Sequence, residues 1–292
     1  MVEIRAPQEF PFLFALPADG PLRVVPALQD PRRRDFAERE VILDLRACAH
    51  VGFPAALWCI VYLSLAQRGG AECLLRPPER KAVADFLREL GVFAALRETG
   101  VAVDETESAP PAHSVVVLPI TRFTTTDGAQ DLAMDALARW NQLPANLRVQ
   151  TSETFGELAN NAAEHANSLV GAFGLIQFYR NSRHPPQGWS LACAVADGGV
   201  GIRGSLQRNA SLRPGSDVEA IELAMVEQNS ATCDPDRGFG FTWVSAASTR
   251  LTVHSGNGVV VEGVDDEQTP PYRSERDMLF PGVYVAASVY LG

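Results

Sequence analysis

Three polar side chains stand four residues apart in one segment of the chain. Residues 153–167 read ETFGELANNAAEHAN and contain Glu157, Asn161 and His165, and the preceding Thr151 and Ser152 are possible helix caps. In a helix this spacing keeps side chains on one face, with about 40° of drift per step. An amide oxygen can bind a divalent cation that carries phosphates, and a carboxylate can accept a proton from an attacking water or hydroxyl. The pattern therefore suits metal-assisted phosphoryl chemistry, although the same spacing also occurs on solvated helices.

Two glycine-rich segments follow this predicted helix. The first is an apolar strand, LACAVA at 191–196, that runs into DGGVGI at 197–202. Its aspartate can accept a hydrogen bond from an amino group such as that of adenine, and its glycines let the backbone approach a ligand. The second, RGFGF at 237–241, opens an apolar helical stretch whose N-terminus favours anionic phosphate. Together these features indicate a nucleotide site.

These three segments, in this order and at these separations, resemble the N, G1 and G2 boxes of the GHKL family of ATPases. ELANNAAEHA is especially similar to the N box of anti-sigma-factor serine kinases. The resemblance spans residues of about 114–292 and implies a Bergerat-type two-layer α/β sandwich with a mixed sheet. It also implies ATP and Mg²⁺ as the ligands.

Family roles carry over to this chain by position. The resemblance implies that Asn161 coordinates Mg²⁺ and that Glu157 is the general base. It implies that Asp197 holds adenine, and His165 either orients the base or metal site or only bonds locally. The other nucleotide-binding positions that the two glycine boxes imply are Gly199, Gly201, Ile202, Arg237, Gly238, Phe239 and Gly240.

Other nucleotide-binding motifs do not fit the sequence. Lys81 is the one lysine of the chain and lies in no glycine-rich loop, so a Walker A motif is excluded. A complete Rossmann glycine motif is also missing. Phosphate charge must then be met by Mg²⁺, backbone amides and arginine, with Arg237 as the leading candidate.

The chain also departs from the family. GHKL proteins often enter their last strand through Gly-Thr, whereas here Val283 follows Gly282, so we expect weaker contacts to adenine. No helical hairpin with a phospho-accepting histidine precedes residue 114. His50 and His113 lie in the first half and in a connecting segment, where a structural or exposed role is expected.

The sequence of the first half predicts alternating strands and helices, a pattern typical of an α/β sandwich. We expect strands at 41–45 and near 72–75, a helix at 54–67 with proline in its first turn, and another at 77–90. This order resembles the STAS domain of anti-sigma-factor antagonists over residues of about 10–100. The turn at 50–54, HVGFP, lacks the hydroxyl that phosphorylated STAS domains carry. The resemblance implies a non-phosphorylatable interaction module, and a generic α/β packing domain remains the alternative.

Composition and charge limit the remaining possibilities. The acidic, proline-bearing segment 104–113 predicts a linker between a domain at 1–103 and a domain at 114–292. A formal charge of −10 disfavours nucleic acid as a partner. Five cysteines at wide spacings and the lack of a signal pattern favour a reduced, cytoplasmic protein without structural zinc. The uncharged stretch 47–67 is expected to be a buried core helix rather than a membrane span.

The stretch between the two glycine boxes has the character of a surface excursion that can close over a ligand. We expect Ser216 or Asp217 to cap a helix at 219–228 within it. In the GHKL family this stretch corresponds to the mobile ATP lid.

The leading functional hypothesis is a bacterial, Mg²⁺-dependent ATPase switch that regulates a protein partner in signalling. The alternatives are a nucleotide-sensing module without turnover and a protein serine kinase acting on a separate STAS partner. Oligomeric state is open, with a homodimer one candidate, because dimers are common in the family.

Overall fold

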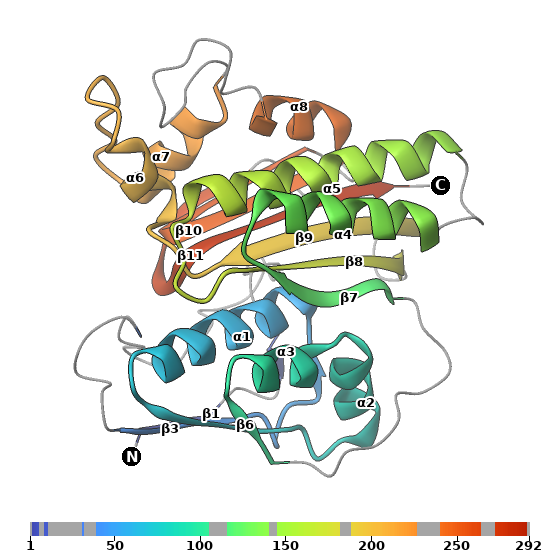
Figure 1. Ribbon diagram of the computed structural model, residues 1–292, viewed down its shortest axis with the longest axis vertical. Helices are drawn as coiled ribbons and strands as arrows, with labels where there is room; N and C mark the ends of the chain where they lie inside the picture. Colours follow the sequence, from blue (N-terminus) through green and yellow to red (C-terminus); the bar gives the residue numbers. More distant parts are fainter. Residues whose placement is uncertain are drawn as a thin grey trace. The chain divides into compact units, whose positions relative to one another are not determined.

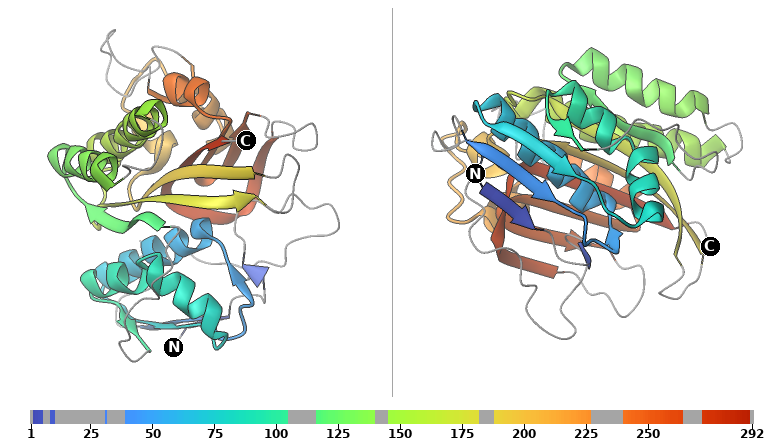
Figure 2. Two further views of the ribbon diagram at one scale, coloured as in Figure 1. Left: turned by 90° about the vertical axis from the view of Figure 1, so that its right-hand side faces the viewer. Right: turned by 90° about the horizontal axis from the view of Figure 1, so that it is seen from below.

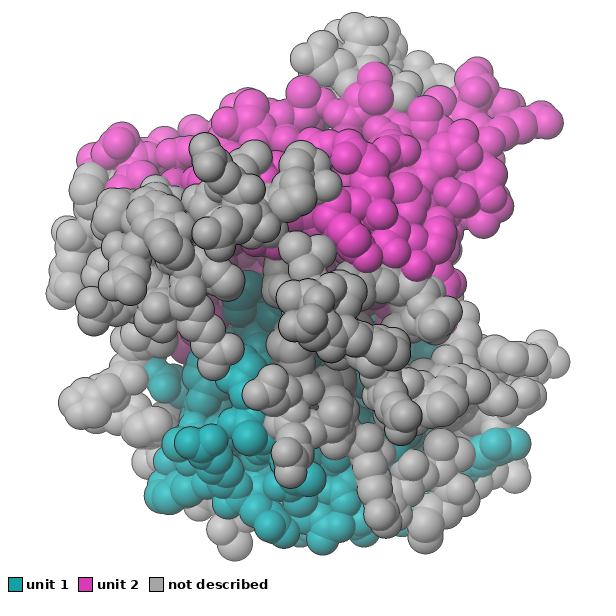
Figure 3. All heavy atoms as spheres, turned by 180° about the vertical axis from the view of Figure 1, so that it is seen from behind, with its two compact units in different colours: residues 1–114 teal, residues 115–292 magenta. Residues whose placement is uncertain are grey.

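The chain folds into two compact units. Unit 1 comprises Met1–Ser114 and unit 2 comprises Val115–Gly292, coloured separately in Figure 3. The computed structural model describes residues 2–5, 9–10, 31, 39–104, 116–139, 145–181, 188–226, 240–263 and 272–290. The predicted linker lies outside these ranges except for Asp104. Both units are of mixed α/β type, with a parallel sheet in unit 1 and an antiparallel sheet in unit 2.

Unit 1 is built on a parallel sheet with the strand order β1-β3-β5-β6 (Figure 1). Its strands are β1 (Val2–Arg5), β3 (Glu40–Asp44), β5 (Glu72–Arg76) and β6 (Ala102–Val103). A separate parallel pair joins β2 (Glu9–Phe10) to β4 (His50–Val51). The helices are α1 (Phe53–Arg68), α2 (Lys81–Glu89) and α3 (Val92–Glu98). The predicted alternation of strands and helices is confirmed, but α2 begins at Lys81 rather than Pro77, because Pro78 holds the preceding residue extended.

Helix α1 is apolar around its whole circumference, which explains the uncharged stretch in the sequence. Every residue from Pro54 to Ala66 is buried, and proline stands in the first turn as predicted. Trp58 and Tyr62, one turn apart, stack with ring centroids 4.8 Å apart. A helix without a polar face is typical of a core element. In the described part of the chain, no helix is long and apolar enough to cross a membrane.

Unit 2 is built on a five-stranded sheet with the order β10-β11-β9-β8-β7. Its strands are β7 (Val116–Phe123), β8 (Ala172–Asn181), β9 (Gly188–Asp197), β10 (Arg250–Glu262) and β11 (Tyr272–Tyr290). Its helices are α4 (Thr126–Arg139), α5 (Ala145–His165), α6 (Gly201–Leu206), α7 (Asp217–Ala224) and α8 (Gly240–Ala247). Helices α4, α5 and α8 lie on one face of this sheet, and α4 runs beside α5 (Figures 1 and 2).

The expectation of a mixed sheet in unit 2 is wrong for the described strands. All four pairings, β7 with β8, β8 with β9, β9 with β11 and β11 with β10, are antiparallel. Strands β8 and β9 follow each other directly in the chain, as do β10 and β11, and such hairpin neighbours pair antiparallel. A parallel pair needs a crossover connection, and those occur here in unit 1.

Helix α5 carries the predicted chemistry and is longer than the sequence indicated. It begins at Ala145, so Thr151 and Ser152 lie inside the helix and are not its caps. Their hydroxyls instead donate to the carbonyls of Leu147, at 2.8 Å, and Ala133, at 3.0 Å. The second bond ties α5 to α4. A hydroxyl that bonds a backbone carbonyl is tolerated inside a helix, which is why these residues gave a misleading start signal.

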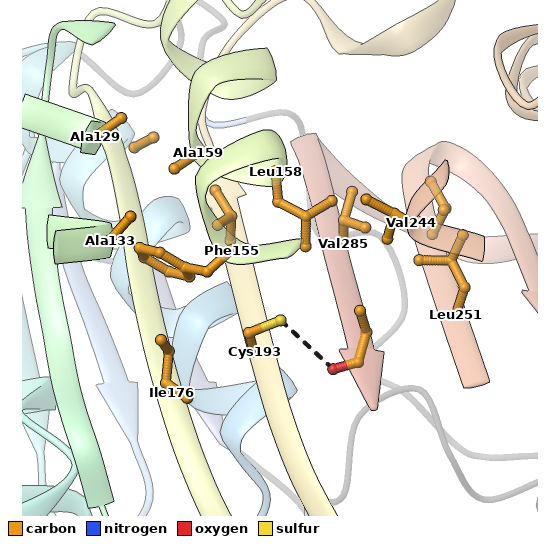
Figure 4. Close-up of a cluster of buried hydrophobic side chains, with 14 of the residues drawn as sticks. Ala129, Ala133, Phe155, Leu158, Ala159, Ile176, Cys193, Val244, Leu251 and Val285 are labelled. Atoms are coloured by element: carbon orange, nitrogen blue, oxygen red, sulfur yellow. Dashed lines mark hydrogen bonds between the residues drawn. The ribbon is translucent and has the colours of Figure 1, made fainter. Parts of the chain in front are cut away.

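The core of unit 2 fills the space between α5 and the sheet (Figure 4). Phe155 and Leu158 project from α5 onto strands β8, β9 and β11 and are almost fully buried. Cys193 on β9 belongs to the same cluster and donates its thiol to the carbonyl of Ala287 on β11, at 3.7 Å. This packing fixes which face of α5 is turned away from the core.

A cluster of charged side chains lies at the carboxyl end of the unit 1 sheet. Asp44 ends β3 and is 7% exposed. The Arg46 guanidinium donates to both carboxylate oxygens, with Nη2 2.6 Å from Oδ2 and Nε 3.0 Å from Oδ1. Nη1 of Arg76, on β5, lies 3.8 Å from Oδ2 of Asp44. The hydrogen bonds from Arg46 hold the pKa of Asp44 below its ordinary value, although burial acts in the opposite direction.

Replacing Asp44 with Asn should destabilise unit 1 by about 1–2 kcal/mol at neutral pH. The folded pKa is lowered, so the stabilising effect is complete above the unfolded pKa and is lost as the pH falls through the folded pKa. The difference between the two proteins should therefore narrow in acid. Urea unfolding at a series of pH values measures it, and Asp85→Asn, at an exposed pair with Lys81, is the control with a smaller expected loss. Equal stability at neutral pH would contradict the assignment.

Candidate functional site

The polar face of α5 carries a carboxylate and an amide in contact. Asn161 donates a side-chain hydrogen bond to Glu157, and both side chains are partly buried. Burial raises the pKa of Glu157 above its ordinary value, the Glu164 carboxylate raises it further, and the bond from Asn161 lowers it. Glu164 stands two helical turns beyond Glu157, which accounts for their repulsion. A carboxylate with a raised pKa is better suited to accept a proton than an ordinary surface glutamate.

His165 ends α5 at the far end of this face. Its Nε2 lies 4.0 Å from the Glu164 carboxylate, and its side chain is about one quarter exposed, at 28%. This contact is local, because Glu164 is the preceding residue. This geometry fits the predicted local role of His165 and leaves its orienting role as a prediction.

Strand β9 delivers Asp197 to the same side of the sheet as α5. Leu191, Cys193 and Val195 alternate along β9 and pack in the core beneath the helices, and Asp197 continues that alternation. Its side chain is 3% exposed, and Oδ1 accepts a 2.7 Å hydrogen bond from the amide of Gly199. This bond orients the carboxylate, whose two oxygens together offer about four acceptor sites.

The turn at residues 197–202, called the Asp197 turn below, is tied to the loop that follows α5. The amide of Val200 donates to the carbonyl of Ala166 at 2.9 Å, and the amide of Gly198 donates to Ser168 Oγ at 3.3 Å. Gly199 lies so close that an added Cβ would stand 2.0 Å from the Ala166 carbonyl oxygen. The glycine at this position therefore permits a close backbone approach. Two segments about 30 residues apart in sequence become one rigid structure.

The other end of the Asp197 turn is tied to β10. Ile202 donates its amide to Ser255 Oγ at 2.8 Å, and both residues are buried. Gly201 has a φ of 76° and begins α6. The amides of Gly198, Gly199, Val200 and Ile202 are thus all engaged within the protein. The turn is built to hold Asp197 in place rather than to offer these amides to phosphate.

Gly282 on β11 forms the wall next to Asp197. Its φ is 137°, and an added Cβ would lie 2.1 Å from the Asp197 carbonyl oxygen and 2.9 Å from the Gly199 amide nitrogen. The following residue, Val283, pairs with Asp197 across the two strands. The predicted departure from the family, valine after this glycine, is therefore located directly beside the aspartate.

The structure describes the segment predicted as a lid as far as Val226. Ser216 caps α7 by accepting the Glu219 amide at 3.1 Å, as predicted. Asp217 accepts the Asn257 amide of β10 at 2.9 Å. Glu275 of β11 accepts the Val218 amide at 3.0 Å. Helix α7 is thus fastened to the β10–β11 hairpin.

A second set of contacts supports the end of α7. Arg273 of β11 pairs with Glu222 of α7 and with Glu262 of β10. Thr242 of α8 donates its hydroxyl to the carbonyl of Met225 at 3.0 Å, which links α8 to the residue after α7. These contacts position the start of α8 relative to the rest of the site.

The structure brings together some of the predicted site residues and does not describe others. Glu157 and Asn161 share one face of α5, and the loop after this helix bonds to the turn that carries Asp197. Gly240 begins α8. The other three residues of the second glycine box lie outside the described residues, and they are Arg237, Gly238 and Phe239.

Several residues that support the site could not be predicted from the sequence. Ser168 lies in the loop after α5 and Ser255 lies on β10, and each accepts a hydrogen bond from a backbone amide of the Asp197 turn. Asp217 does the same for the β10 hairpin. A serine in the turn after a helix signals only a local bend, and nothing in a strand sequence indicates which distant amide a hydroxyl will meet.

Other reactive groups among the described residues are buried or isolated. Cys48, Cys59, Cys73 and Cys193 are free and buried. Burial raises the pKa of Cys48 to about 11 and those of Cys73 and Cys193 to about 12, so these thiols stay protonated. Within the ranges that the structure describes, no three His, Cys, Asp or Glu side chains gather as a metal site.

Comparison of the chain with protein-family models, with curated proteins and with solved structures found no match. The assignment of this site therefore depends on its own residues and geometry.

Replacing Gly282 with Ala should destabilise unit 2 by at least about 2 kcal/mol. The positive φ strains any side chain, and the added Cβ collides with the backbone of Asp197. Thermal or urea unfolding measures the loss. Gly100→Ala is the matched control, because its φ is also positive, at 83°, while its Cβ would meet only a side-chain atom at 3.8 Å. A loss no larger than that of the control would show that the close approach to Asp197 is not constraining.

Replacing Glu157 with Gln should stabilise unit 2 at neutral and alkaline pH. A raised folded pKa means that the wild type has its full stability below the unfolded pKa, near 4.5, and loses stability as the pH rises through the folded value. Glutamine has no charge to bury, so the gain should vanish in acid. Melting temperatures of the wild type and the variant, measured from acid to alkaline pH, test this prediction. Glu153→Gln, an exposed position on the same helix, should change stability by no more than about 0.5 kcal/mol.

Proposed function

We propose that unit 2 binds Mg·ATP and acts as an ATPase switch of the GHKL type in a regulatory protein. The observation that carries this proposal is the bonded junction between α5 and the Asp197 turn. It joins the helix with Glu157 and Asn161 to the strand end with Asp197. A cation-binding amide, a carboxylate base and a buried adenine acceptor are the three groups that such a site needs.

The base end of the nucleotide is assigned to Asp197. The Gly199 amide orients the Asp197 carboxylate, whose oxygens carry lone pairs enough to accept the exocyclic amino group of adenine as well. Gly199, Gly201 and Ile202 shape the turn around it, and Gly282 lets strand β11 pack closely against it. Because guanine presents a carbonyl where adenine presents an amino group, this acceptor favours adenine.

The phosphate end is assigned to the polar face of α5. Asn161 is a suitable oxygen donor for Mg²⁺, which commonly takes one or two protein ligands and completes its shell with phosphates and water. The lack of a described three-residue cluster is compatible with such a site. When bound, Mg²⁺ neutralises phosphate charge. Glu157 then accepts a proton from the attacking water, and the bond from Asn161 keeps its carboxylate in place.

Unit 1 is proposed to be a STAS-like interaction module through which the switch acts on a protein partner in the bacterial cytoplasm. Helix α1 begins with Gly52 at its cap position and has no side-chain cap hydrogen bond. No hydroxyl is therefore present at the turn where phosphorylated STAS domains are modified. Regulation of this unit is expected to come from the nucleotide state of unit 2 rather than from its own phosphorylation.

Binding and turnover of Mg·ATP by the full chain test the function directly. We expect Asn161→Ala to weaken Mg-dependent ATP binding by about tenfold or more, since one metal ligand is lost. Glu157→Ala should keep binding within about threefold and slow phosphate release by about a hundredfold. Calorimetry and a phosphate-release assay measure the two effects. Glu153→Ala, exposed on the same helix, is the control expected to match the wild type.

Two results would overturn parts of this assignment. Hydrolysis that is unaffected by Glu157→Ala would remove the base role. A wild-type chain that binds no ATP in the presence of Mg²⁺ would remove the function altogether.

A second candidate, nucleotide sensing without turnover, is favoured by Val283. Its side chain is apolar where a hydroxyl could support adenine, and it lies across from Asp197. If the site senses nucleotide only, tight Mg·ATP binding should occur with no phosphate released over many hours. Multiple turnovers would exclude this candidate.

Replacing Val283 with Thr should tighten ATP binding about fivefold, because one additional hydrogen bond contributes about 1 kcal/mol. The two side chains have nearly the same shape, so the strand should be undisturbed. Val285→Thr, deeper on the same strand face and 5% exposed, is the control and should lower stability without tightening binding. Unchanged or weaker ATP affinity in the first variant would contradict the placement of adenine beside Val283.

A further inference from the structure

We propose that Ser168 is a positioning residue that sets the adenine-binding carboxylate in register with the metal-binding helix. The inference rests on the proposed nucleotide function and deepens it. It concerns the loop of residues 166–171, called the α5–β8 loop, which connects the end of α5 to the start of β8. The hydroxyl of Ser168 bonds to its own loop and to the Asp197 turn, so its effect on the ligand passes through Asp197.

The hydroxyl of Ser168 is the centre of three hydrogen bonds. It donates to the carbonyl of Gly171 at 2.7 Å and accepts the amides of Val170 and Gly198, each at 3.3 Å. Two of these bonds close the loop on itself, and the third reaches the Asp197 turn. Because the proton is committed to the Gly171 carbonyl, the oxygen lone pairs are turned towards the two amides.

The surrounding backbone leaves the loop little freedom to adjust. Ala166 continues the helical ladder of α5 through a bond from its amide to the carbonyl of Ala162, at 3.2 Å. Its own carbonyl accepts the Val200 amide, and Gly199 packs against it without room for a Cβ. Asn167 has a φ of 50°, a left-handed conformation uncommon outside glycine. A loop held in such a conformation needs bonds on both sides, and Ser168 supplies the bonds after Asn167.

These contacts give the Asp197 turn two attachments to the α5–β8 loop, at Val200 and at Gly198. They lie on either side of Gly199, the residue whose amide orients the Asp197 carboxylate. With both attachments present, the turn can neither pivot nor slide relative to the end of α5. Loss of the Ser168 bond leaves Val200 as the one attachment to this loop, so the part of the turn around Gly198 and Gly199 is held less firmly. Adenine would then meet a carboxylate whose direction varies.

The proposal separates the two ends of the ligand. A Ser168→Ala protein should lose affinity for ATP, because the carboxylate that meets adenine is no longer fixed. It should keep its affinity for Mg²⁺ with inorganic triphosphate, which has phosphates but no base. A purely structural defect would weaken both ligands alike. In steady state the same variant should raise KM for ATP while leaving kcat nearly unchanged.

The experiment compares Mg·ATP and Mg·triphosphate affinities by calorimetry for the full chain and three variants. We expect Ser168→Ala to bind ATP about fivefold more weakly, the loss of one hydrogen bond, and triphosphate as the wild type does. Ser168→Thr, which keeps the hydroxyl, should retain most of the ATP affinity. Ser152→Ala is the matched control, because Ser152 lies on α5 and donates to the Ala133 carbonyl of α4. It should bind both ligands as the wild type does.

Amide hydrogen exchange of the ligand-free proteins provides a readout that does not depend on nucleotide. The Gly198 amide should exchange faster in Ser168→Ala than in the wild type. Unchanged exchange would overturn the role of Ser168 but not the proposed function. Equal losses for ATP and triphosphate, or none, would also overturn it while leaving the proposed function intact. A wild type that binds neither ligand would remove both. If Ser168→Ala does not fold, Ser168→Cys, similar in size but a weaker acceptor, takes its place in the same measurements.

Discussion

The hydrogen bond from the Val200 amide to the Ala166 carbonyl is the constraint on which the candidate site depends. It fixes the end of α5 against the end of β9, at a point where Gly199 lets the two backbones meet. The bond uses backbone groups, so it tolerates changes of side chain at Ala166 and Val200. Around it, Ser168 and Ser255 bind the remaining amides from two sides. The polar residues of the helix and the buried aspartate are therefore held at a fixed separation.

Two other parts of unit 2 hold this junction in place, the core packed under α5 and the β10–β11 hairpin. Core side chains such as Phe155 and Leu158 anchor α5 to the sheet, which leaves Glu157 and Asn161 on its other face. The β10–β11 hairpin holds α7 in place through contacts of Asp217 and Arg273. A site framed by packed elements on two sides is positioned with more precision than one carried on loops alone.

The same site carries an electrostatic cost. Glu157 is partly buried and faces Glu164, so its ionised form is disfavoured in the folded protein. Functional sites often retain such unfavourable groups because the chemistry needs them, and the surrounding core offsets the loss. Asp44 in unit 1 is the opposite case. Its charge is matched by Arg46 and Arg76, which is the arrangement expected of a structural ion pair.

The sequence by itself determined strands β3 and β5 and helix α1 of unit 1, the apolar strand before Asp197, the Ser216 cap and the shared helical face of Glu157 and Asn161. These follow from local periodicity, proline position and capping, which act over a few residues. Only the tertiary structure decided the antiparallel order of the unit 2 sheet, the true start of α5, and the roles of Ser168, Ser255 and Gly282. These features depend on hydrogen bonds or close approaches between separate segments, such as Ser152 with Ala133 and Gly198 with Ser168. Local residue preferences carry no information about such partners, because the free energy of those contacts arises only when the chain has folded.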